Sequence, residues 1–105
     1  MGHNNVTITE RETRCLRSVD AFKAIADGNR IKIINMLSER EMCAIELLEQ
    51  LEISQPTLSH HMKVLALASI VKTRKSGAQV YYSINVKKMA ELSELLGEFA
   101  SGAGK

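Results

Sequence analysis

The side chains best suited to chemistry lie close together, between residues 54 and 63 of this 105-residue chain. All of them can donate or accept hydrogen bonds. They are Ser54, Gln55, Thr57, Ser59, His60, His61 and Lys63. Three apolar residues among and after them, Leu58, Met62 and Leu65, are spaced by four and three residues. That spacing predicts a helix with one buried apolar side and one polar outer side.

Basic residues without acidic neighbours extend this block to residue 88. Residues 54–88 contain six Lys or Arg and no Asp or Glu. Residues 1–53 contain seven basic and nine acidic residues, and residues 89–105 contain one and three, so the net charge of the chain is only +2. A positive block in a near-neutral chain favours an anionic partner, of which nucleic acid is the commonest. Chance clustering of the charges is the alternative.

Composition restricts the class of protein. Hydrophobic residues make up 45% and charged residues 25%, which is typical of a folded domain, and the aromatic content of 4% predicts an aliphatic core. No apolar stretch approaches the ~20 residues of a membrane span, and the N-terminus lacks the apolar region of a signal peptide. Two cysteines are too few for a disulfide scaffold, so we expect a reduced protein in the cytoplasm.

Three helices are predicted before the polar block. Apolar residues at intervals of three predict the first over residues 10–26, and the polar residues 1–9 are expected to form a flexible arm. The Asp-Gly-Asn sequence at residues 27–29 ends this helix, and its Asp or Asn could cap a second one. A third, short helix is expected over residues 44–51.

The fourth helix is predicted to begin around Pro56, because proline fits the first turn of a helix and not its interior. Ser54 or Gln55 is then the expected N-cap. Two short helices joined by three or four residues, the second with a polar outer face, have the form of a DNA-binding helix-turn-helix. A plain helical hairpin is the alternative.

A β-hairpin is predicted next. Residues 70–75 and 80–84 alternate in polarity as strands do, and the sequence Ser-Gly-Ala-Gln between them supplies a turn. The first strand carries Lys72, Arg74 and Lys75, which suit contacts with phosphates or the minor groove.

A last helix is predicted over residues 86–100, before a flexible tail at residues 101–105. Its apolar seam either covers the core or pairs with a second copy of the chain. The predicted fold is therefore mostly α with a β-hairpin wing. It is a winged helix-turn-helix of about five helices and two strands, and it occupies residues 10–100.

In this order and spacing, the segments resemble the ArsR/SmtB family of bacterial winged-helix repressors. Residues 22–30 (FKAIADGNR) resemble the family's opening FKALADPTR, with Gly28 in place of proline. Residues 53–65 (ISQPTLSHHMKVL) are very similar to LSQSTVSHHLKLL, and the hairpin resembles the wing pattern RxG…VYYSL. The resemblance covers about residues 16–100.

The resemblance implies a homodimeric repressor that binds an operator in double-stranded DNA. Gln55, Ser59 and His60 match family positions that face bases. The side chains expected to contact phosphate or sugar are Ser54, Thr57, His61, Lys63, Arg74 and Lys75. For His61, packing against the neighbouring helix is the alternative. The first and last helices are expected to form the dimer interface, through Leu16, Val19, Met89, Leu92, Leu96 and Phe99.

The resemblance also raises the question of an inducer, because many family members sense metal ions. Their Cys-x-Cys pair at the start of the third helix is reduced here to Cys43, since Ile45 stands at the second position. A family metal site on the last helix is expected to be absent, because Lys87 replaces a ligand. Cys15 and Cys43 could still bind a soft metal or metalloid as thiolates, or be oxidised. The alternative is that both are ordinary buried residues and the protein senses nothing.

The residues favour two other functional classes less. A winged helix could bind an acidic protein partner, but such a module would not need the polar face formed by Gln55, Thr57, Ser59 and His60. An enzyme is not expected. The block lacks carboxylates, the histidines have no Ser or Cys nucleophile beside them, and no glycine-rich phosphate loop exists.

Overall fold

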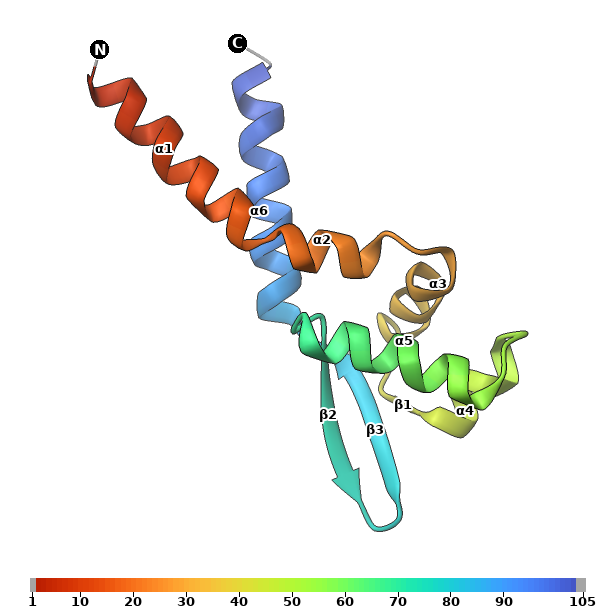
Figure 1. The fold of residues 1–105 in the computed structure, drawn as a ribbon. Coiled ribbons are helices and arrows are strands. Elements are labelled where there is room, and N and C mark those ends of the chain that lie inside the picture. Colours follow the sequence, from red (N-terminus) through yellow and green to blue (C-terminus); the bar gives the residue numbers. More distant parts are fainter. Residues whose placement is uncertain (1, 104–105) are drawn as a thin grey trace.

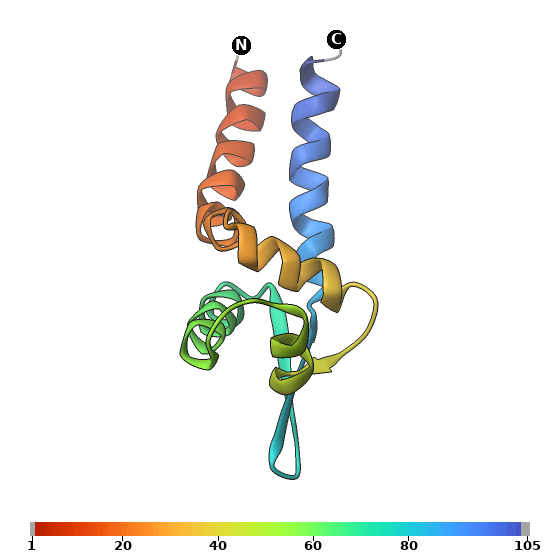
Figure 2. The ribbon, with the colours of Figure 1, turned by 90° about the vertical axis from the view of Figure 1, so that its right-hand side faces the viewer.

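The computed structural model describes residues 2–103, which form six helices and three strands (Figure 1). The helices are α1 (Gly2–Arg17), α2 (Val19–Ile25), α3 (Gly28–Leu37), α4 (Ala44–Gln50), α5 (Gln55–Leu67) and α6 (Val86–Ala103). The strands are β1 (Met42–Cys43), β2 (Val71–Ser76) and β3 (Gln79–Ile84). Helices α1 and α6 extend from one end of the molecule, and the β2–β3 hairpin extends from the other (Figures 1 and 2). This is the predicted winged helix-turn-helix fold.

The first predicted helix is two helices, so the expected count of five was one too low. Ser18, with φ −96° and ψ −1°, separates α1 from α2. Its hydroxyl donates a hydrogen bond to the carbonyl of Arg14 at 3.0 Å. A serine bonded back to the preceding turn bends a helix, and here the chain turns so that Ala21 and Ala24 of α2 enter the core.

Helical structure extends to both ends of the described part of the chain. Helix α1 begins at Gly2, where an arm was expected over residues 1–9, and α6 continues to Ala103, where a tail was expected from residue 101. Helix prediction from apolar periodicity stops where the periodicity stops, whereas a helix can extend beyond it. Residues 1, 104 and 105 lie outside the described part of the chain.

The sheet has a third strand that the sequence pattern did not predict. The strand order is β1-β3-β2, with both pairs antiparallel. Met42 pairs with Tyr82 and Cys43 with Tyr81. A strand of two residues carries no alternation, so its pairing with Tyr81 and Tyr82, far along the chain, leaves no local signal.

Both predicted helix caps are present. The Asp27 carboxylate accepts a hydrogen bond from the Arg30 backbone N–H at 3.1 Å and caps α3. The Ser54 hydroxyl accepts one from the Thr57 N–H at 3.3 Å, and Pro56 lies in the first turn of α5. Of the alternatives Asp27 or Asn29, and Ser54 or Gln55, the first member of each pair is the cap. Such a cap stabilises a helix by about 1 kcal/mol.

The core is aliphatic, as the composition indicated. Its most deeply buried side chains are Ile33, Leu47, Leu58, Leu65 and Ile70. They come from α3, α4, α5 and the start of the wing, and each contributes roughly 1.5–3 kcal/mol by leaving water. Helix α5 is therefore held from its apolar side by three other elements. Among the described residues, no helix combines the length and the apolar character that crossing a membrane requires.

Candidate nucleic-acid interface

Helix α5 presents a polar surface to solvent. Its apolar side, with Leu58, Met62 and Leu65, is buried in the core. Six of the seven predicted polar residues are exposed. They are Ser54, Gln55, Thr57, Ser59, His60 and Lys63. The structure therefore brings the predicted base-facing and phosphate-facing side chains together on one open surface, which we call the recognition face.

Two hydroxyls at the start of the recognition face have a structural role as well. The Ser54 hydroxyl accepts from the Thr57 N–H and donates to the Thr57 hydroxyl oxygen at 2.9 Å. The hydroxyl hydrogen of Thr57 then remains available to an acceptor outside the chain. The cap and the polar surface at this helix end are built from the same two residues.

His61 is separate from the recognition face. It is 7% exposed, and its Nδ1 atom lies 3.0 Å from Nη1 of Arg30 in α3. Arg30 also donates through Nε to the Ala24 carbonyl at 2.6 Å, so His61 helps to join α5 to α2 and α3. Its ring is tilted by 52° to that of His60, which is exposed. These contacts correspond to the packing alternative for His61, and we leave it out of the interface.

The wing is exposed from Lys72 to Ala78. Gly77 has a φ of +60° in the two-residue turn, as the first central residue of a type II′ hairpin turn requires. No ion pair involves Lys72, Lys75 or Lys63 within the described part of the chain. These three exposed ammonium groups, Lys63 on the recognition face and Lys72 and Lys75 on the wing, suit contacts with phosphate oxygens.

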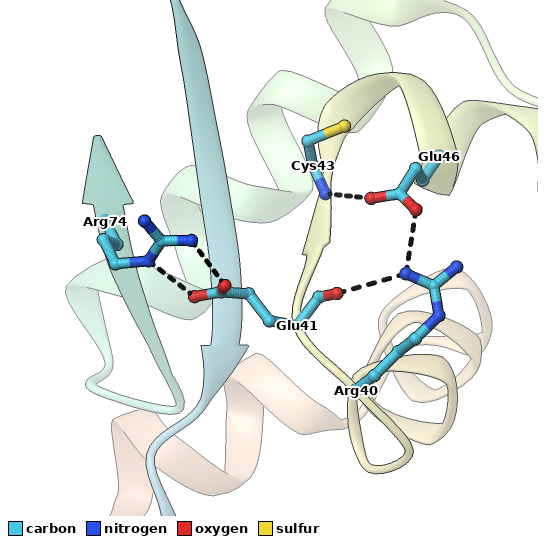
Figure 3. A network of polar contacts seen from close by, with 5 residues as sticks. All are labelled: Arg40, Glu41, Cys43, Glu46 and Arg74. Carbon is cyan, nitrogen blue, oxygen red and sulfur yellow. Dashed lines mark hydrogen bonds and ion pairs between the residues drawn. The ribbon is translucent and has the colours of Figure 1, made fainter. Parts of the chain in front are cut away.

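Arg74 differs from the lysines of the wing because it has a carboxylate partner. Figure 3 shows its guanidinium between strand β2 and Glu41, with Nε and Nη2 donating to the two Glu41 oxygens at 3.1 and 2.7 Å. It also lies 4.9 Å from the centre of the Tyr81 ring. The hydrogen bonds from Arg74 lower the pKa of Glu41, and those same bonds raise the pKa of Arg74. Sequence reasoning missed this pairing, because Glu41 is 33 residues away from Arg74.

The predicted dimer-interface residues fall into two groups. Leu16, Val19, Leu96 and Phe99 are exposed, with exposed fractions between 38% and 65%. Leu92 is 4% exposed and belongs to the core of the chain itself, and Met89 is partly buried against that core. Helices α1 and α6 are joined by Arg14, whose Nη1 and Nη2 donate to the two carboxylate oxygens of Glu98.

The two cysteines are free thiols in different parts of the fold. Cys15 is half-buried on α1, and Cys43 is buried where β1 meets α4. The Cys43 N–H donates to the Glu46 carboxylate at 3.0 Å, and Glu46 also binds Arg40 (Figure 3). In the described part of the chain, no group of three or more His, Cys, Asp or Glu residues is arranged to hold a metal ion.

The fold and the recognition face define a winged helix-turn-helix protein of the regulatory type. Comparison with known proteins agrees with this class: the profile described as bacterial regulatory protein, arsR family, matches residues 27–73, from the cap of α3 into β2. The chain belongs to the ArsR family. The relatives found are transcriptional regulators, which are not enzymes.

Three relatives illustrate the range of similarity. The arsenical resistance operon repressor of Staphylococcus aureus is 48% identical over 64 residues, 61% of this chain and 62% of that protein. An uncharacterized HTH-type transcriptional regulator of Methanocaldococcus jannaschii is 36% identical over 78% of this chain and 93% of its own length. The solved structure of reduced HlyU from Vibrio cholerae has a TM-score of 0.69 and 34% identity, and the match covers 86% of this chain and 95% of that one.

Proposed function

We propose that this protein is a homodimeric repressor in the cytoplasm that binds a specific operator in double-stranded DNA. One observation carries the proposal: the recognition face is polar and exposed while the opposite side of α5 is fixed in the core. A helix held in this way can enter the major groove without a change of fold. The basic wing beside it supplies the charge that DNA binding needs.

Each polar side chain then has a role set by its chemistry. Gln55 can pair bidentately with adenine, and Ser59 and His60 can donate to acceptor atoms of bases in the major groove. Lys63 and Lys75 are suited to phosphates, together with the hydroxyls of the cap. In this assignment the lysines supply affinity and the face of α5 supplies sequence preference.

A homodimer is the form that fits the exposed apolar residues on α1, α2 and α6. Leu16, Val19, Leu96 and Phe99 leave apolar surface in water that a second copy would cover. A two-fold axis through this surface would place the two α5 helices in successive major grooves, about 34 Å apart.

The proposal is tested by the salt dependence of DNA binding. Fluorescence anisotropy with a labelled mixed-sequence duplex should give an affinity that falls steeply as salt rises, because several phosphates are neutralised. Lys32 is exposed on α3, outside the proposed interface. The control variant Lys32→Ala should therefore bind DNA as the wild type does. Affinity that is equal at low and moderate salt would contradict the proposal. Binding to an acidic protein with no preference among DNA sequences would favour an interaction module.

A second proposal concerns an inducer that reacts with thiols. Some relatives are named for arsenical or cadmium resistance. Cys43 lies in β1, directly paired with the wing strand β3. Modification at Cys43, with Cys15 supplied by the same or the partner chain, would disturb this pairing. Arsenite or hydrogen peroxide should then release DNA from the wild type but not from Cys43→Ser. Equal release from the wild type and from Cys43→Ser would contradict this second proposal and favour the alternative that the protein has no thiol sensor.

A further inference from the structure

Arg74 reaches its partner across the whole sheet. In the register of the three strands, Arg74 of β2 lies opposite Tyr81 of β3, and Tyr81 lies opposite Cys43 of β1. The Arg74 guanidinium lies over the Tyr81 ring. The side chain ends at Glu41, just before β1 (Figure 3). Nε and Nη2 of Arg74 each donate a hydrogen bond to a different carboxylate oxygen of Glu41, so the contact is bidentate.

This ion pair adds little to stability. The Arg74 side chain is 55% exposed and that of Glu41 is 35% exposed. Pairs of this kind are screened by salt and contribute little in water. The β2–β3 ladder and the core, rather than this pair, hold the wing.

The pair does determine what the guanidinium can bind. A carboxylate offers Arg the same planar, bidentate, anionic partner that a phosphate offers. While Glu41 accepts from Nε and Nη2, the positive charge of Arg74 is offset and this bidentate edge of its guanidinium is occupied. Lys72 and Lys75 on the same strand have no such partner in the described chain.

We propose that Glu41 mimics a DNA phosphate and competes with the operator backbone for Arg74. This inference rests on the DNA-binding function proposed above. When DNA is bound, the Arg74 fork exchanges the carboxylate for a phosphate, and Glu41 is left to water. Glu41 thus lowers affinity for any DNA sequence, and so limits nonspecific binding, without touching a base.

The direct test is Glu41→Gln, which removes the negative charge and keeps the size of the side chain. Its affinity for a mixed-sequence duplex, measured by anisotropy at low salt, should be about two- to fivefold higher than that of the wild type, the range that an exposed pair allows. The gain should shrink as salt rises. Glu39→Gln is the matched control, because Glu39 is exposed two residues earlier and makes no ion pair within the described chain.

The role of Arg74 is tested by combining variants. Arg74→Gln should weaken DNA binding more in the Glu41→Gln protein than in the wild type. In the Glu41→Gln protein the Arg74 guanidinium has no carboxylate at position 41 to leave before it binds a phosphate. The inference is overturned if Glu41→Gln binds no tighter than Glu39→Gln, or if its gain survives in the Arg74→Gln background. If the wild type and Glu41→Gln both fail to bind DNA, the proposed function fails as well. If the wild type binds and Glu41→Gln changes nothing, only this inference fails.

Discussion

Nη1 of Arg30 on α3 lies 3.0 Å from Nδ1 of His61, on the buried side of α5. A guanidinium only donates, so Nδ1 of His61 must be the acceptor and carries no proton in this contact. Arg30 is fixed in turn by the Ala24 carbonyl. A polar contact on the inner side of α5 therefore supports the orientation of its polar outer face, in addition to the apolar core.

Loss of this contact should destabilise the fold. His61→Ala leaves the part-buried Arg30 donor without its partner, so the free energy of unfolding should fall by about 1–3 kcal/mol in urea denaturation. His61→Asn, which retains an acceptor close to the position of Nδ1, should recover part of the loss. His60→Ala, at the exposed neighbouring position, should change stability by no more than about 0.5 kcal/mol. Equal losses at the two histidines would contradict this role.

Two substitutions on α5 should separate sequence preference from general affinity. Gln55→Ala should weaken binding to a selected operator by about 1–3 kcal/mol while leaving binding to random duplex nearly unchanged. Lys63→Ala should weaken both, and should make the slope of log affinity against log salt less steep by about 1. Anisotropy titrations on both duplexes at several salt concentrations measure these effects. The assignment is wrong if the two variants behave alike.

In the described chain, Ser69 is the one residue other than glycine with a positive φ, 61°. It lies between helix α5 and strand β2 of the wing. A side chain in this conformation costs roughly 1–2 kcal/mol, so Ser69→Gly should raise the free energy of unfolding by about 1 kcal/mol. The Asn85 side chain bonds the backbone carbonyl at this position, so the substitution keeps that contact. Ala68→Gly, where φ is −86°, should destabilise instead. Destabilisation by both would show that φ is not the deciding factor.

The contact between α1 and α6 should depend on pH. The hydrogen bonds from Arg14 lower the pKa of Glu98 below its ordinary value of 4.5. A lowered pKa in the folded state contributes stability above 4.5 that is lost as the pH falls through the folded value. Glu98→Gln should therefore be less stable than the wild type at pH 7, and the difference in urea midpoint should disappear in strong acid. A difference that persists there would contradict the ion-pair account. Glu49→Gln on α4 is the control.

The exposed apolar residues of α6 should determine the oligomeric state. Phe99→Glu or Leu96→Glu puts charge into the proposed dimer surface, so light scattering with size-exclusion chromatography should detect a shift from dimer to monomer. Ile45→Glu, which charges an equally exposed site on α4, should leave the dimer intact. A wild-type monomer at micromolar concentration would contradict the dimer.

Much of the fold could be predicted because its signals are local. Asp27, Ser54 and Pro56 mark helix starts through their own backbone preferences, and Gly77 marks the hairpin turn. The break at Ser18 was missed, because a serine inside an apolar period is compatible with an unbroken helix until its hydroxyl bonds the preceding turn.

The candidate site was less predictable where it depends on distant residues. The outer face of α5 follows from the period of its apolar residues, but whether His61 lies inside or outside depends on Arg30, 31 residues earlier. Strand β1 and the pairing of Arg74 with Glu41 exist only because the third strand joins the sheet. Contacts of this kind leave no periodic trace in one sequence.

Selection from a pool of random DNA duplexes tests the central claim most directly. The wild-type protein is used to capture duplexes over several rounds, and the captured DNA is sequenced. The account predicts enrichment of an inverted repeat whose half-sites are centred about one helical turn apart, 10–10.5 base pairs. A captured pool that has the base composition of the starting pool and contains no inverted repeat would contradict sequence-specific binding by a two-fold dimer.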